Sequence, residues 1–320
     1  MKVLTIALIA ILLTGCSAST PTHTPTNTPI EAALDTPTST TTAELFEGRL
    51  LFSRFIEASH TFTGMYISET DGSAETAVPL PWSEGGGRWS RSGKEIAVPT
   101  LLEDQRVGTA IIATDGSVLR VLSISDATLN LACTIWSRDD TRLACEGWDD
   151  SDSSRTGIYT VNASDGSDIK RLTTPPAGMH DMPGDYSPVG QFVFKRHSGD
   201  EGSGPLMLLD ANGGEPQVLY DGSMEDPGRF SPDGHLVATS IGGSLLIIDL
   251  DGKIVYTISI SGYYLFGPAW SPDGTRIAFS QSTSQYRAEI YTSLPDGTDL
   301  QRVTNTDANE IAVDWGVDSE

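Results

Sequence analysis

The chain has few basic residues: only 20 Lys and Arg stand against 43 Asp and Glu among its 320 residues. The formal net charge of −23 creates a field that repels nucleic acid and anionic lipid surfaces, so neither is expected as a partner. The same field attracts cations and basic peptides. Solubility outside a cell is the alternative, and it is the better single explanation of the acidic composition.

Patterns that accompany several enzyme classes are also lacking. No Gly-x-Ser-x-Gly sequence marks a hydrolase nucleophile, and the triple glycine at 85–87 has no Lys-Ser or Lys-Thr pair to bind phosphate. The five His are scattered. The acidic run at 149–152 could bind calcium but lacks a spaced ligand ladder, so we interpret it as a solvated loop. We therefore predict no catalytic residue, no metal site and no cofactor.

A sustained helical period is absent after the first residues, and the chain instead repeats a β-hairpin. The clearest copy, residues 268–279, places a tight Ser-Pro-Asp-Gly turn between Trp270 and a β-branched and aromatic strand. Pro272 presets φ at the first central position of this turn, and Gly274 takes a positive φ without a Cβ penalty. One hairpin is marginally stable in water, so the copies are expected to pack on one another.

The aromatic residue of this template recurs at intervals of 40 to 50 residues. The six template aromatics are Trp89, Trp136, Tyr186, Phe230, Trp270 and Trp315. Six Asx-Gly turns, each between apolar runs, mark a second hairpin per repeat. Two hairpins make four strands, and a period in the forties is typical of a propeller blade. We predict an all-β fold, a six-bladed β-propeller of four-stranded antiparallel blades over residues 44–320, with the template aromatics in its core.

The repeat resembles the WD40-like repeat of TolB-type β-propellers. The residues that carry the resemblance are residues 270–279, Ile290-Tyr291 and Arg302-Val303-Thr304, with Ile158-Tyr159 and Arg171-Leu172-Thr173 as a second copy. The resemblance covers about residues 45–320 and implies the propeller fold, which serves many functions. The N-terminal α/β domain of that family has no counterpart in this sequence, where a Thr/Pro-rich stretch stands in its place.

The first repeat lacks its leading strand, and the C-terminus supplies one. Residues 48–52 align with the strand that follows the template turn, and residues 312–315 align with the strand that precedes it. We predict that these two segments pair and close the ring, which removes two exposed sheet edges.

The N-terminus carries signals for export and anchoring. Residues 1–15 are interpreted as a signal peptide, since the apolar stretch is too short to span a bilayer. The sequence up to Cys16 resembles the lipobox of bacterial lipoproteins, which implies a lipid anchor on Cys16; a secretory signal with a coincidental Cys is the alternative. The rest of residues 16–43 is a Thr/Pro-rich tether that cannot bury enough surface to fold. The expected location is the bacterial cell envelope, on the extracytoplasmic side of a membrane.

Two further cysteines flank the turn of the third template. Cys133 and Cys145 fall nearly opposite each other on its two strands, which brings Cα atoms within disulfide range. We predict a Cys133–Cys145 disulfide, with two buried thiols as the alternative.

Candidate binding residues emerge from counting backwards from each template aromatic. The strand leading into the aromatic is innermost in a propeller, so the residue five positions earlier is expected at one mouth of the central channel. Four of these six positions are carboxylates, where composition alone predicts about one. With two neighbours, the acidic collar comprises Glu84, His180, Asp181, Glu225, Asp226 and Glu310. It is predicted to bind a cation or a partner's Lys or Arg; the alternative is that loops of an acidic protein are acidic by chance.

These features favour a monomeric, non-catalytic module that binds an envelope or secreted protein or peptide, a basic one being compatible with the charge. The competing hypothesis is a carbohydrate-active lyase or hydrolase that uses the collar carboxylates for acid/base chemistry. A structural domain without a ligand is the third alternative.

Overall fold

The computed structural model describes residues 46–56, 61–80, 86–199, 202–283 and 287–318. The predicted signal peptide, lipidation site Cys16, tether and collar residue Glu84 lie outside these ranges. Among the residues that the structure describes, none forms a helix long and apolar enough to cross a bilayer.

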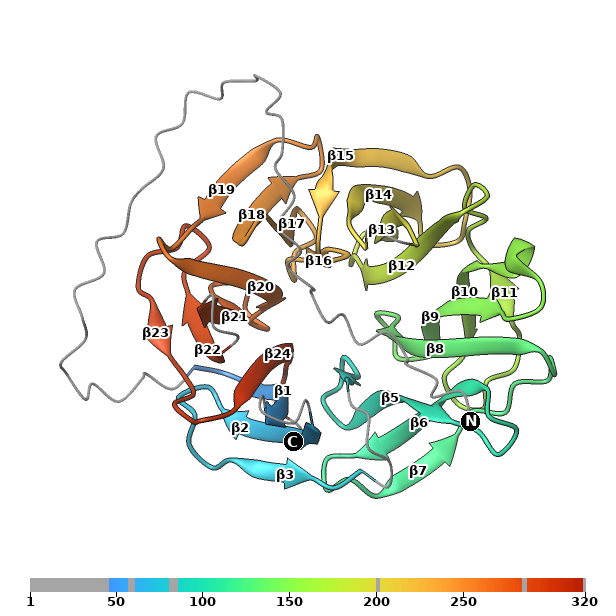
Figure 1. Ribbon diagram of the computed structural model, residues 1–320, viewed down its shortest axis with the longest axis horizontal. Coiled ribbons are helices and arrows are strands. Elements are labelled where there is room, and N and C mark those ends of the chain that lie inside the picture. The colour runs from blue at the N-terminus through green and yellow to red at the C-terminus, as the bar shows by residue number, and fades with distance from the viewer. Residues whose placement is uncertain (1–45, 57–60, 81–85, 200–201, 284–286, 319–320) are drawn as a thin grey trace. The chain divides into compact units, whose positions relative to one another are not determined.

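Six four-stranded antiparallel sheets are arranged around a central axis (Figure 1). Blade one consists of β24 (Asn309–Gly316), β1 (Arg49–Ile56), β2 (Thr61–Glu69) and β3 (Thr76–Val78). Blade two consists of β4 (Arg88–Trp89), β5 (Glu95–Leu101), β6 (Val107–Ala113) and β7 (Val118–Val121). Blade three consists of β8 (Leu129–Trp136), β9 (Arg142–Asp149), β10 (Gly157–Asn162) and β11 (Lys170–Arg171), with a short 3₁₀ helix η2 (Ser153–Arg155).

The remaining three blades follow the same order. Blade four consists of β12 (Met179–Tyr186), β13 (Gln191–Ser198), β14 (Gly204–Asp210) and β15 (Gln217–Met224). Blade five consists of β16 (Arg229–Phe230), β17 (Leu236–Ile241), β18 (Ser244–Asp249) and β19 (Ile254–Ile258). Blade six consists of β20 (Tyr263–Trp270), β21 (Ile277–Thr283), β22 (Ala288–Ser293) and β23 (Gln301–Arg302). The predicted all-β six-bladed propeller is therefore confirmed.

The predicted closure of the ring is also confirmed. The C-terminal strand β24 pairs antiparallel with the N-terminal strand β1, with Trp315 opposite Leu50 and Gly316 opposite Arg49. A bulge between Leu51 and Phe52 shifts the register of this pair. Because the first and last strands share one sheet, neither end of the ring leaves a free inner edge.

The template turn forms as its residues predict. Gly274 has φ of +74°, and its amide donates to the carbonyl of Ser271 at 2.9 Å. The Ser271 hydroxyl donates to Asp273 Oδ1 at 2.6 Å, which fixes the Asp side chain within the turn. A β-branched residue at Gly274 would be strained at this φ, which explains why glycine ends the turn.

The template aromatics are buried between blades, as predicted. Two of them also bond across the blade boundary: Trp136 Nε1 donates to the Arg88 carbonyl, and Trp270 Nε1 donates to the Arg229 carbonyl, each at 3.1 Å. Each indole therefore attaches its own blade to the inner strand of the preceding blade, and the ring is held together by packing plus directed hydrogen bonds.

The predicted disulfide joins Cys133 on β8 to Cys145 on β9, which are register partners. The bridge encloses a loop with a sequence separation of 12, and both residues are fully buried. We expect the Cys133→Ala, Cys145→Ala double variant to lose about 2–3 kcal/mol of unfolding free energy, the loop-closure value for this loop length. Urea unfolding measures the loss. Non-reducing peptide mapping that finds two free thiols in protein purified under oxidising conditions would contradict the bridge.

Candidate functional site

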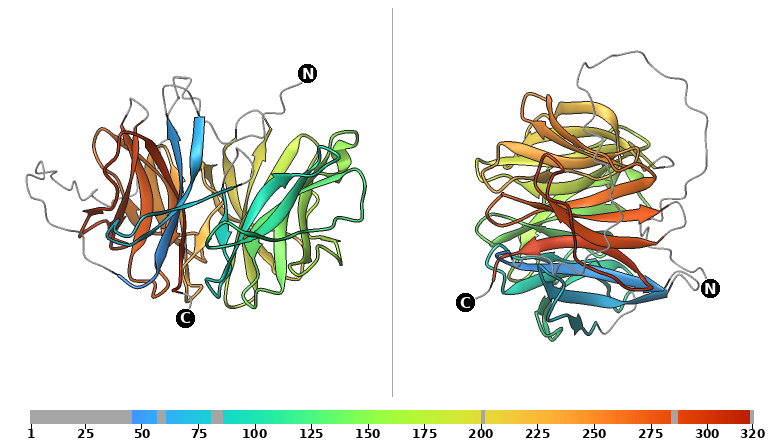
Figure 2. Two further views of the ribbon diagram at one scale, coloured as in Figure 1. Left: turned by 90° about the horizontal axis from the view of Figure 1, so that it is seen from below. Right: turned by 90° about the vertical axis from the view of Figure 1, so that its left-hand side faces the viewer.

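Two candidate binding surfaces lie at the opposite ends of the inner strands. Figure 2 shows the strands running between the two faces of the ring. On β12, Asp181 lies near the start and Tyr186 at the end, about 16 Å apart at the usual rise per residue. The collar positions and the template aromatics therefore lie at opposite ends of the channel. We call these ends the collar face and the turn face, the latter carrying the Ser-Pro-Asp-Gly turns.

At the collar face, Asp181 and Glu310 are fully buried in ion pairs. Asp181 accepts two hydrogen bonds from Arg196, from Nε at 2.6 Å and from Nη2 at 2.8 Å. Glu310 accepts from Arg54 Nε at 2.7 Å. Each arginine is the register partner of its carboxylate on the neighbouring strand. These two carboxylates already have a cation, so they contribute little free negative charge to a ligand at the mouth.

Glu225 and Asp226 lie beside the buried ammonium group of Lys195. Lys195 Nζ donates to the carbonyls of Gly202 and Glu225. Asp226 Oδ2 accepts from Ser240 Oγ at 2.6 Å and from the Gly267 amide at 2.8 Å, which connects blades five and six. Burial, with the charge of Asp226, raises the pKa of Glu225, and burial lowers the pKa of Lys195. The binding role of Glu225 and Asp226 stays a prediction. Both residues also make contacts within the protein, Glu225 through its carbonyl to Lys195 and Asp226 through its carboxylate to Ser240 and Gly267.

His180 stacks on His197, its register partner, with ring centroids 5.7 Å apart. Burial lowers the pKa of His197, which favours the neutral imidazole at this residue. The described ranges contain no group of three or more metal-ligating side chains.

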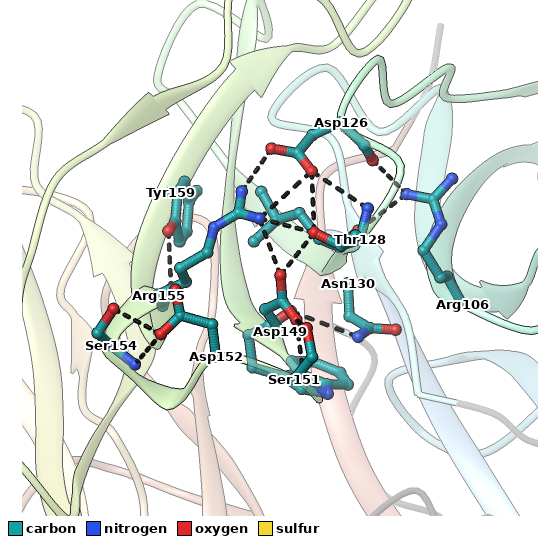
Figure 3. A network of polar contacts seen from close by, with 12 residues as sticks. Arg106, Asp126, Thr128, Asn130, Asp149, Ser151, Asp152, Ser154, Arg155 and Tyr159 are labelled. Carbon is teal, nitrogen blue, oxygen red and sulfur yellow. Dashed lines mark hydrogen bonds and ion pairs between the residues drawn. The ribbon is translucent and has the colours of Figure 1, made fainter.

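The acidic run at 149–152 is part of a polar network between blades two and three, which the sequence did not indicate (Figure 3). Arg155 bridges the carboxylates of Asp126 and Asp149. Asp149 also accepts from the Ser151 amide at 2.9 Å and from Thr128 Oγ1 at 2.5 Å. The hydrogen bonds from Ser151 and Thr128 lower the pKa of Asp149. Both Asp149 oxygens thus have protein donors, and the interpretation as a merely solvated loop is wrong for Asp149.

Glu146 on β9 makes stability depend on pH. Burial raises its pKa to about 7, opposed by the charge of Lys195. Because this value exceeds the 4.5 of an unperturbed glutamate, the folded protein holds the proton more tightly than the unfolded chain. That contribution is complete below about pH 4.5 and is lost as the pH rises through 7. We expect the unfolding free energy of Glu146→Gln, taken relative to that of wild type, to rise by about 1–3 kcal/mol between pH 4.5 and pH 8. Urea unfolding at both pH values measures this change. A difference that stays the same at both pH values would contradict this.

The turn face carries a pocket of about 160 Å³ on the axis of the ring, which we call the axial pocket. Residues from all six blades line it, and they include five of the six template aromatics: Trp89, Tyr186, Phe230, Trp270 and Trp315. Arg91, Arg138, Arg229, Asp185 and Asp314 supply its charged lining.

Ion pairs connect most of these charges. Arg91 pairs with Asp185, and Arg229 Nη2 lies 3.2 Å from Asp314 Oδ1. Arg88 Nη1 approaches the same Asp314 oxygen at 3.8 Å. Burial raises the pKa of Asp314, against the charges of Arg88 and Arg91. The pocket is therefore a polar, ion-paired site surrounded by aromatic rings.

Sequence reasoning missed this site, although a signal was present. The residue directly before each template aromatic is Arg88, Ile135, Asp185, Arg229, Ala269 or Asp314. The collar residues were found by taking the residue five positions before each template aromatic. Taking the residue one position before it would have found two arginines and two aspartates.

Comparison with known proteins confirms the resemblance to TolB-type propellers. Two curated proteins named Tol-Pal system protein TolB match in part: the one from Methylobacillus flagellatus is 35% identical over 77 residues, covering 23% of this chain and 18% of the relative. The one from Alcanivorax borkumensis is 35% identical over 72 residues, 22% of this chain and 17% of the relative. The matched stretch thus spans less than a fifth of either TolB. No family model matches the chain.

Solved structures share the fold more extensively. TolB from Acinetobacter baumannii superposes with a TM-score of 0.66 at 21% identity, covering 87% of this chain and 68% of that one. An oligogalacturonate lyase in complex with manganese gives a TM-score of 0.52 at 15% identity, covering 82% of this chain and 75% of that one. At these identities the likeness concerns the fold alone, and the same fold serves both a TolB and a lyase.

Proposed function

We propose that the protein is a non-catalytic binding module of the bacterial cell envelope that takes a protein or peptide at a mouth of its channel. The partial match to TolB supports an envelope protein with a protein partner. Cys16 is proposed as the lipid attachment site and residues 17–43 as the tether. Replacing Cys16 by Ser should move the protein from the membrane fraction to the soluble fraction.

The size of the axial pocket carries the proposal. Pockets that enclose small-molecule substrates usually measure about 300–1,000 Å³, whereas the axial pocket measures about 160 Å³. Such a volume suits one side chain or terminal group of a larger partner, and an adjoining pocket of about 380 Å³ offers space for a further part of that partner. Of the two ends, the turn face is the better supported, because Asp181 and Glu310 at the collar face already have arginine partners.

Crosslinking in intact cells tests the proposal. A photoreactive residue at Arg138, an exposed member of the axial pocket, should form adducts with one or a few envelope proteins that mass spectrometry identifies. The same residue at Val121, exposed on the outer strand β7, is the control. Equal adduct patterns at both positions, or none at position 138, would contradict a partner at the turn face.

A further inference from the structure

The axial pocket has an excess of positive charge in a strongly acidic protein. Four arginines line it or lie directly beside it, against three aspartates. The arginines are Arg88, Arg91, Arg138 and Arg229, and the aspartates are Asp140, Asp185 and Asp314. The whole chain carries a net charge of −23, so this local balance runs opposite to the protein as a whole.

The residues before the template aromatics show a three-blade period. Blades one and four have Asp314 and Asp185, and blades two and five have Arg88 and Arg229. The two aspartates play equivalent parts: Asp314 Oδ2 accepts from the Trp89 amide at 2.9 Å, and Asp185 Oδ2 accepts from the Phe230 amide at 3.2 Å. The aspartates therefore connect neighbouring inner strands, which gives them a structural reason to be there.

Arg91 and Arg138 break this symmetry. They stand two positions after the template aromatics of blades two and three, where blades five and six have Pro232 and Pro272. The surplus charge therefore lies on one side of the pocket. Within the described ranges, no backbone contact comparable to those of the aspartates involves these two guanidinium groups.

Arg138 is exposed, and among the described residues no hydrogen bond or ion pair engages its guanidinium group. Burial and the charge of Arg91 lower the pKa of Arg138, which indicates that the two cations repel each other. Arg91 Nε is buried without a hydrogen-bond partner in the described part of the chain. The Arg138 guanidinium group is suited to an anion, because a planar fork matches a carboxylate. Arg91, which pairs with Asp185, adds a second positive charge beside it.

We propose that the axial pocket binds a carboxylate of an acidic peptide segment, with Arg138 as its ligand and Arg91 as a neighbouring positive charge. This inference rests on the proposed binding function and specifies its ligand. It differs from the collar hypothesis, which expects a basic group at the other end of the channel.

A second pocket favours a peptide over a free anion. It measures about 380 Å³ and adjoins the axial pocket, since Ser231, Pro232 and Trp270 line both. Apolar surfaces of Leu236, Tyr256, Leu294 and Pro295 form much of its wall. The second pocket lies at blades five and six, across the axis from Arg91 and Arg138 on blades two and three. An extended segment of several residues can reach both pockets with an acidic and an apolar side chain, whereas a small anion fills only one.

The test uses the full chain and three probes at constant ionic strength. The probes are a short fluorescein-labelled peptide of repeating Glu-Leu-Gly, its Lys-Leu-Gly counterpart, and sodium sulfate. The acidic peptide should bind despite the net negative charge of the protein. The Arg138→Ala variant should bind this peptide with about tenfold lower affinity. The Tyr256→Ala variant should bind the acidic peptide with lower affinity and should bind sulfate as wild type does. Arg287→Ala removes an exposed arginine that pairs with Asp307 and serves as the matched control with no effect.

Several outcomes would overturn the inference. Preference for the basic peptide, equal binding by wild type and Arg138→Ala, or binding of sulfate without the peptide would each do so. A cellular partner that is still crosslinked in the Arg138→Ala background, with the photoreactive residue at Ser231, would leave the binding function intact while refuting the role of Arg138. Absence of any partner would refute the function itself.

Discussion

A chain that ends at residue 308 is expected to lose the cooperative thermal unfolding transition of the intact protein. The truncation removes β24 and leaves Leu50 and Phe52 of β1, both buried, without their covering strand. It also removes Trp315, and the loss of one buried Trp side chain costs about 3–5 kcal/mol. The unfolding free energy of such domains is only about 5–15 kcal/mol. The loss of a whole strand is therefore expected to leave the domain without a stable fold. Calorimetry and size-exclusion chromatography would show a missing transition and aggregates formed through the exposed edge.

A circular permutation provides the matched control. Residues 309–318 can be moved ahead of residue 46 and joined by a short Gly-Ser linker, because the Gly48 amide lies 3.2 Å from Asp318 Oδ2. The permuted chain rebuilds the hairpin of the other blades, with Trp315 again opposite Leu50. It should regain a single sharp transition close to that of wild type. A monomeric truncated protein with an unchanged melting curve would show that β24 does not close the ring.

The fold could be predicted from the sequence because its determinants are local. The turn at Ser271–Gly274 depends on residues that are adjacent in the chain, and each Asx-Gly pair acts within a few residues. The closing sheet was predictable because each end of the chain contains half of the same template. The bulge between Leu51 and Phe52 was not predictable, since it depends on how two segments more than 250 residues apart adjust to each other.

The candidate site was less accessible, because it depends on neighbours in space. Counting placed Asp181 and Glu310 correctly on inner strands, but it could not show that they form ion pairs with Arg196 and Arg54. Glu310 and Arg54 are 256 positions apart, and nothing in the sequence near Glu310 indicates that partner. The same reasoning applies to the axial pocket, where Asp185 meets Arg91 from another blade. A pattern of residue types shows where charges lie, and only the packing of blades shows which of them are neutralised.

The ion pair of Asp181 gives the second large effect. Replacing Arg196 by Ala leaves a fully buried carboxylate without its cation, which should cost about 3–5 kcal/mol of unfolding free energy. The double variant Asp181→Leu, Arg196→Met removes both charges and fills a similar volume, so it should recover most of the loss. Arg287→Ala, at an arginine whose side chain is 46% exposed, should change stability by no more than about 0.5–1 kcal/mol. Urea unfolding of the four proteins measures each step.

This comparison also decides between the two ends of the channel. A large cost for Arg196→Ala, with rescue in the double variant, means that Asp181 is committed to holding β12 against β13 and is not free to bind a partner. If Arg196→Ala is instead as stable as wild type, the Asp181 carboxylate is solvated and accessible at the collar face. A basic partner at the collar would then be a better hypothesis than it is now, and the preference for the turn face over the collar face would lose its basis.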